Sequence, residues 1–88
     1  MDLSQCHWNG LKNDRLKKTR GVSFEEIVGA KLIGIENHPS KMLQERMLFE
    51  WKGYIWVVPF VRQEKGLFLK TLYASRKHTK QYLGGKNQ

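Results

Sequence analysis

Several residue patterns are missing from this 88-residue chain, and each absence excludes a class of protein. A single cysteine, Cys6, cannot form an internal disulfide and does not make a structural zinc site alone. No apolar run approaches the roughly 20 residues that span a bilayer. The N-terminal residues lack the basic start and apolar stretch of a secretory signal. We therefore expect a cytoplasmic protein without a membrane segment.

Familiar catalytic motifs are missing as well. The chain has no Gly-rich phosphate loop, no CxxC pair and no two histidines at metal-ligand spacing. The adjacent Glu25 and Glu26 are better explained as the acidic first turn of a helix than as metal ligands. We therefore expect no metal and no cofactor. The remaining Arg, Lys, His, Glu and Tyr side chains suffice for metal-independent RNA cleavage, which needs an acid, a base and cations around the phosphate.

Acidic residues are scarce, which makes the surface positive. Lys and Arg number 16 against eight Asp and Glu, a formal net charge of +8. From Lys65 onward there are six basic residues and no acid, and a second basic cluster lies between Lys12 and Arg20. Such an excess favours polyanions through counterion release, whereas a surface charged only for solubility needs no single sign. The one-sided C-terminal segment therefore favours a polyanionic partner over solubility alone.

Cap and turn residues predict two N-terminal helices. A short strand over residues 5–8 precedes a polar helix over residues 9–20, in which Leu11 and Leu16 are the large apolar residues and which Gly21 ends. Ser23 and Glu26 form a capping box that opens a second, short helix.

A period of two then predicts an antiparallel meander. Strands are expected over residues 32–37, 47–51, 54–61 and 67–73, with a tight turn at Lys52-Gly53 and a loop over 62–66. Pro59 predicts an edge or a bulge. In the last strand, Leu67, Leu69, Thr71 and Tyr73 are expected on one face.

Ser75 caps a final basic helix that stops at Gly84-Gly85. The prediction is one α+β domain over residues 1–88, with flexible ends at about residues 1–5 and 84–88. The two N-terminal helices pack on an antiparallel sheet of four to five strands.

Cations gather where the last strand meets the last helix. Lys70 lies on the opposite strand face from Leu69, and Arg76 and Lys77 follow at the helix start. The functional interpretation is a phosphate clamp, whereas the spacing alone favours a set of snorkelling cations that protects a sheet edge. The predicted supporting RNA-binding residues are Arg46, Arg62, Lys80 and Arg20.

The histidines His7, His38 and His78 are acid–base candidates, although a single histidine is more often structural. His78 is preferred because it lies beside Arg76 and Lys77. Aromatic side chains provide stacking surfaces for bases, but in a chain of this size most belong to the core.

Two stretches resemble the BrnT family of type II toxins. The first stretch begins with Trp8-Asn9, continues through the polar helix and ends with the run Arg20-Gly-Val-Ser-Phe-Glu-Glu. The second stretch is Lys70-Thr-Leu-Tyr-Ala-Ser-Arg-Lys-His-Thr-Lys. The resemblance covers roughly residues 8–83. It implies a RelE-like ribonuclease fold, metal-independent RNA cleavage that arrests translation, and a cognate antitoxin encoded alongside.

The resemblance also assigns residues. Lys70 falls on the strand arginine of the family's final motif, and Arg76 and Lys77 fall on its Arg-Lys pair. Asn9 stands where the family has Asp, and Arg20 where it has His. Lysine at Lys70 keeps the charge but loses bidentate phosphate geometry. The alternative function is a non-catalytic module of the same fold that binds RNA or a partner.

Overall fold

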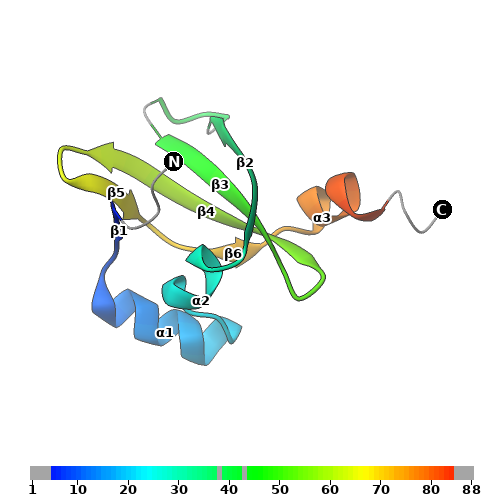
Figure 1. Cartoon of the computed structure of the whole chain (residues 1–88), viewed down its shortest axis with the longest axis horizontal. Coiled ribbons are helices and arrows are strands. Elements are labelled where there is room, and N and C mark those ends of the chain that lie inside the picture. Colours follow the sequence, from blue (N-terminus) through cyan, green and yellow to red (C-terminus); the bar gives the residue numbers. More distant parts are fainter. Residues whose placement is uncertain (1–4, 38, 43, 85–88) are drawn as a thin grey trace.

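A computed structural model describes residues 5–37, 39–42 and 44–84, and within them a six-stranded sheet lies among three helices. Figure 1 shows α1 and α2 close together and α3 apart from them, near the C-terminal end. The α+β class is therefore as predicted. The elements are β1 (Cys6–His7), α1 (Gly10–Arg20), α2 (Phe24–Val28), β2 (Lys31–Asn37), β3 (Gln44–Trp51), β4 (Tyr54–Gln63), β5 (Gly66–Leu69), β6 (Tyr73–Ala74) and α3 (Arg76–Tyr82).

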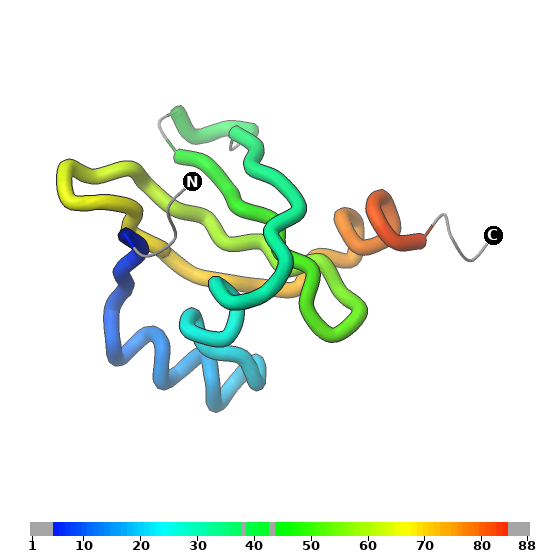
Figure 2. Tube along the Cα trace, in the orientation of Figure 1, coloured from blue at the N-terminus to red at the C-terminus, as the bar shows by residue number. Residues whose placement is uncertain are grey.

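The strand order is β1-β5-β4-β3-β2, and β6 pairs with β4 beyond the end of β5. The prediction of an antiparallel sheet is wrong for β1, which runs parallel to β5 with Cys6 opposite Leu67. Figure 2 shows the blue N-terminal segment beside the yellow β5. Gly66 permits this approach, because a Cβ at its position would lie 2.2 Å from the Gln5 carbonyl oxygen.

The predicted caps at Gly21 and Ser23 form, and Asn9 supplies an N-cap that was not predicted. The Asn9 side chain accepts the Lys12 backbone N–H at 2.9 Å, and Gly21 ends α1 in the left-handed region at φ 77°. Ser23 and Glu26 make both hydrogen bonds of the capping box at the start of α2. Both N-terminal helices are therefore where the sequence predicts them.

The turn at Lys52-Gly53 also forms, with both residues at positive φ (52° and 79°), as a two-residue hairpin turn requires. It joins β3 to β4, whose register runs from Trp51 opposite Tyr54 to Gln44 opposite Val61.

Alternate residues of the central strands face two separate apolar cores. The large core lies on the α1/α2 face, where Leu16, Phe24 and Ile27 meet Met47 and other strand residues. Neighbouring positions along the strands point to the opposite face, where α3 packs, because side chains alternate along a strand. This small core consists of Leu48, Ile55 and Val57, with Ile33, Tyr73 and Leu83 packed against it.

Of the edge or bulge predicted at Pro59, the edge is wrong, because β4 is a central strand, and a bulge lies opposite Pro59 in the segment that faces it. β4 pairs with β5 through Phe60 and Leu69, and with β6 through Val57 and Tyr73. Between these pairs β4 contributes residues 58 and 59, whereas the facing segment contributes residues 70–72, one more. The Lys70 N–H donates to the Pro59 carbonyl at 2.9 Å, and the missing N–H of proline falls at the interruption.

This bulge splits the single strand predicted over residues 67–73 into β5 and β6. The extra residue reverses the alternation, so that Leu69 and Leu72 both join the large core while Tyr73 packs against the small one. The prediction that Tyr73 shares a face with Leu67 and Leu69 is therefore wrong. The bulge is the physical cause, because its extra residue turns the Tyr73 side chain to the opposite face of the sheet.

Some predictions fall on undescribed parts of the chain. The flexible ends expected at residues 1–5 and 84–88 lie outside the described residues except for Gln5 and Gly84, and His38 also lies outside them. α3 ends at Tyr82 with Leu83 as its cap, close to the predicted stop at Gly84-Gly85, of which Gly85 is undescribed. Among the described residues, no helix has both the length and the apolar character needed to cross a bilayer.

Candidate functional site

The first turn of α3 is fixed to β4 at Ile55. The Ser75 N–H donates to the Ile55 carbonyl at 2.9 Å, and the Ile55 N–H donates to the Thr79 hydroxyl at 2.8 Å. The same hydroxyl donates to the Ser75 carbonyl at 2.7 Å, and the Ser75 side chain caps the helix by accepting the His78 N–H at 3.1 Å. The start of α3 is thus held in one position relative to the β3–β4 hairpin.

His78 lies under α3 rather than on its surface, with only 8% of the residue exposed. Its Nδ1 is 2.6 Å from the Ser75 Oγ, and its Nε2 is 3.0 Å from the Glu36 Oε1. A neutral ring with its hydrogen on Nε2 satisfies both contacts, because the serine hydroxyl then donates to Nδ1 and Nε2–H donates to the carboxylate. Both ring nitrogens are therefore engaged within the protein.

Glu36 joins His78 to the sheet. Its carboxylate also accepts a hydrogen bond from Arg46, which lies directly opposite it on β3. Burial raises the pKa of the Glu36 carboxyl, but the hydrogen bond from His78 and the charge of Arg46 outweigh burial, so that the pKa is lowered overall. Glu36, Arg46 and His78 form one polar cluster, which we call the α3 anchor.

The exposed cations of α3 lie outside this anchor. Arg76, Lys77 and Lys80 are exposed, and none of the ion pairs in the described part of the chain includes them. No Asp or Glu follows Glu64 in the sequence. Arg76 and Lys80 line an open groove of about 430 Å³ between α3 and the hairpin, together with Tyr54 and Thr79.

Lys70 and Arg20 both contact the bulge over residues 70–72: Lys70 belongs to it, and Arg20 is hydrogen-bonded to it. Only β6 separates this bulge from α3. Lys70 is exposed there, and the Arg20 guanidinium donates to the Leu72 carbonyl at 3.0 Å. Arg20 comes from the end of α1, so the bulge is in contact with a cation from a distant part of the chain.

Arg62 lies apart, at the end of β4 farthest from Ile55. Its guanidinium makes two hydrogen bonds to Glu45, at 2.5 and 3.2 Å, which lower the pKa of the Glu45 carboxyl and raise that of Arg62. RNA binding by Arg62, by Arg46 and by the other cations stays a prediction. In this structure the charges of Arg46 and Arg62 are each matched by a carboxylate.

Sequence reasoning missed Glu36 and the engagement of His78. The two residues are 42 positions apart, and nothing in their spacing indicates contact. The available signal was the placement of Glu36 on a strand beside the one that carries Arg46, which predicts a cross-strand pair once the register is known.

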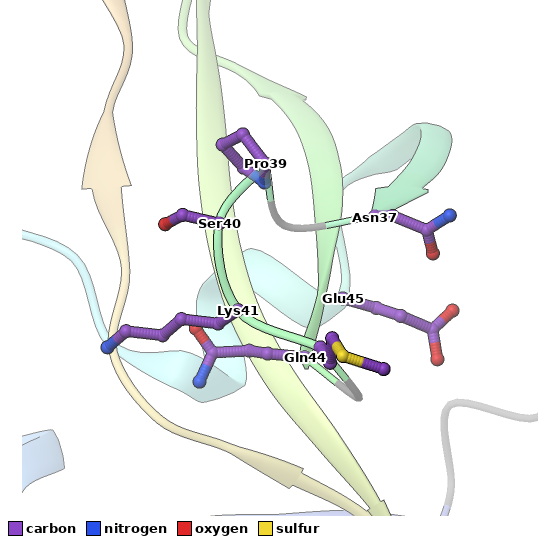
Figure 3. Close-up of a pocket in the computed structure, with 7 residues that line it drawn as sticks. Asn37, Pro39, Ser40, Lys41, Gln44 and Glu45 are labelled. Atoms are coloured by element: carbon purple, nitrogen blue, oxygen red, sulfur yellow. The ribbon is translucent and has the colours of Figure 1, made fainter.

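A second hollow, of about 510 Å³, lies at the loop between β2 and β3. Figure 3 shows Asn37 and Glu45 on one side of this loop and Lys41 and Gln44 on the other, so their polar groups do not converge. Within residues 5–37, 39–42 and 44–84, no group of three His, Cys, Asp or Glu side chains is placed to hold a metal ion. The α3 groove is therefore the better candidate site.

A scan against protein-family models gives no match, and searches of curated proteins and of solved structures give none either. The BrnT resemblance and the RelE-like fold are therefore carried forward as proposals.

Proposed function

We propose that this protein binds RNA through α3 and cleaves it without a metal, as the toxin of a type II toxin–antitoxin system with a RelE-like fold. The proposal is carried by the exposed cations of a helix whose start is fixed to the sheet; none of these cations takes part in an ion pair among the described residues. A helix that is fixed in place presents its cations to a phosphate with little reorganisation of the backbone on binding. The resemblance of residues 70–80 to the BrnT motif agrees with this assignment.

The proposed roles belong to residues of α3 and of the bulge before it. Arg76 and Lys77, with Lys70 at the bulge, bind the phosphate and stabilise the charge that develops during cleavage. His78 is the proposed acid or base, and Glu36 fixes its ring. To act on substrate, His78 must exchange its contact with Ser75 or with Glu36 for one with the RNA, because both nitrogens are engaged.

That engagement favours a second candidate, a non-catalytic module that binds RNA with the same surface. In this candidate His78 and Glu36 only hold α3 in place. RNA binding without any cleavage product distinguishes this function from the first.

The proposed partner is an antitoxin that acts in the cytoplasm. An acidic, helical segment laid over Arg76, Lys77 and Lys80 would neutralise the surface that attracts RNA. Its charge is opposite to that of α3, which carries no acidic residue.

The test is induced expression in bacteria of wild type and Arg76→Ala/Lys77→Ala, followed by growth and by the integrity of total RNA. Arg15→Ala/Lys18→Ala is the matched control, since it removes two exposed cations from α1. We expect growth arrest and fragmented RNA with wild type and the control, and neither with the α3 variant.

Normal growth and intact RNA from a folded wild type would contradict the ribonuclease assignment. RNA binding by that same protein in vitro would then establish the non-catalytic module. Arrest by a folded Arg76→Ala/Lys77→Ala variant would remove the catalytic role from α3.

A further inference from the structure

The groove beside α3 is lined by a tyrosine as well as by cations. Tyr54 lines it from the first position of β4 and is 52% exposed, the most exposed aromatic residue in the described part of the chain. Its backbone neighbours hold it in place, because Gly53 completes the hairpin turn on one side and Ile55 is bonded to α3 on the other. The ring is thus exposed while its backbone is fixed.

The other large aromatic residues are engaged. Trp51 has Trp56 edge-on at 5.8 Å and the Lys52 ammonium 4.6 Å from its ring. Tyr82, 41% exposed, lies parallel to the His78 ring at 6.5 Å. Tyr54 is therefore the aromatic residue best placed to receive a ring from outside.

The charges of the groove select an anion. Arg76 and Lys80 are four residues apart on α3, so their side chains lie on the same side of the helix. No lining residue in the described part of the chain carries a carboxylate. The Thr79 hydroxyl is already used as donor and acceptor, which leaves the two cations and the Tyr54 hydroxyl as the polar side-chain groups for a ligand.

We propose that this groove binds one unstacked nucleotide of single-stranded RNA, with its base against Tyr54 and its phosphate between Arg76 and Lys80. The inference rests on the proposed RNA binding and adds a preference for single strands. A base inside a duplex is already stacked on both sides and offers no face to a tyrosine. Every base can stack on a tyrosine, so the site distinguishes single-stranded from double-stranded RNA and does not distinguish one base from another.

The test compares RNA affinities of wild type, Tyr54→Phe and Tyr54→Ala by fluorescence anisotropy. The probe is a labelled 2′-O-methyl oligonucleotide, which lacks the free 2′-OH needed for cleavage and keeps binding separate from catalysis. A matched probe carries abasic sites at every position. Tyr82→Ala is the control variant, and circular dichroism checks that each variant is folded.

We expect Tyr54→Ala to weaken binding of the base-containing probe about 5- to 150-fold, the range for loss of one base–aromatic stack. Tyr54→Phe should stay within about twofold of wild type, because it keeps the ring. With the abasic probe, wild type and Tyr54→Ala should bind equally. In wild type, a duplex of the same sequence should bind more weakly than the single strand.

Equal affinity of wild type and Tyr54→Ala for the base-containing probe would overturn the stacking site while leaving RNA binding by α3 intact. An equal loss on both probes would also overturn it, because the loss would not depend on a base. Absence of any RNA binding by wild type would instead contradict the proposed function itself. If Tyr54→Ala fails to fold, equal binding of base-containing and abasic probes by wild type gives the same negative answer.

Discussion

α1 and α3 are both basic helices, yet the structure uses their charges differently. α1 is joined to the acidic α2: the Asn13 side chain accepts the Phe24 N–H and donates to Glu25, both at 2.7 Å. Lys17 forms an ion pair with Glu26 at 2.8 Å. α3 has no acidic neighbour in sequence, and hydroxyl groups and His78 hold it instead.

α1 is therefore a basic helix whose charges support the fold, whereas the charges of α3 are available to a partner. Two carboxylates of α2 offset part of the charge of α1, whereas the charges of Arg76, Lys77 and Lys80 have no such counterpart among the described ion pairs. Composition alone makes the two helices look alike. Their neighbours make them different.

The largest expected effect on stability comes from the joint between α1 and α2. Asn13→Ala should lower the free energy of unfolding by about 2 kcal/mol, because the buried Phe24 N–H loses its acceptor. Urea unfolding measures the change, with Arg15→Ala, an exposed α1 residue, as control. RNA affinity of the folded Asn13→Ala protein should equal that of wild type, and a clear loss would show that α1 contributes to binding.

The α3 anchor should give the next largest effect. Glu36→Gln removes the charge that His78 and Arg46 share, and should cost about 1–2 kcal/mol of stability. Hydrogen exchange should become faster in α3 but not in α1. Glu64→Gln, at an exposed carboxylate, is the control. Equal exchange in both helices would show that the anchor does not hold α3.

Two serine caps provide a matched pair of smaller changes. Ser23→Ala and Ser75→Ala each remove an N-cap and should each cost about 1 kcal/mol. Only Ser75→Ala should also weaken RNA binding, because it loosens the helix that carries the proposed phosphate clamp. A parallel loss of affinity in Ser23→Ala would contradict a separate role for α3.

The smallest expected effect is on the stability of the protein at low pH. The ion pair with Lys17 and the N–H of Ser23 lower the pKa of Glu26 from 4.5 to about 2. A carboxylate with a lowered folded-state pKa stabilises the fold above the unfolded value and loses that stabilisation as pH falls through the folded value. Glu26→Gln should therefore make stability less dependent on pH between 4.5 and about 2. Urea midpoints over this range test it, and unchanged pH dependence would contradict the prediction.

Much of the fold is predictable where local chemistry decides it. Ser23 and Glu26, Gly21, the Lys52-Gly53 turn and the bulge opposite Pro59 each follow from a cap, a positive φ or a missing donor. These signals lie within a few residues of the structure they specify.

The features that escaped prediction depend on distant pairing. β1 is two residues long, so no periodicity reveals its parallel partner. In α1, Leu11 is 76% exposed whereas the polar Asn13 is buried, since its amide serves a helix that comes later in the chain. The contact of Glu36 with His78 likewise requires the sheet register and the placement of α3.

The most direct test of the central claim is the salt dependence of RNA binding. Each phosphate contact on a single strand contributes about 0.7 to the slope of log K against log salt concentration. Arg76→Ala/Lys80→Ala removes both cations proposed to hold one phosphate and should therefore reduce the slope by about 0.7, whereas Arg15→Ala/Lys18→Ala should leave it unchanged. Equal reductions from the two helices would contradict the claim that α3, and not α1, is the surface that binds RNA.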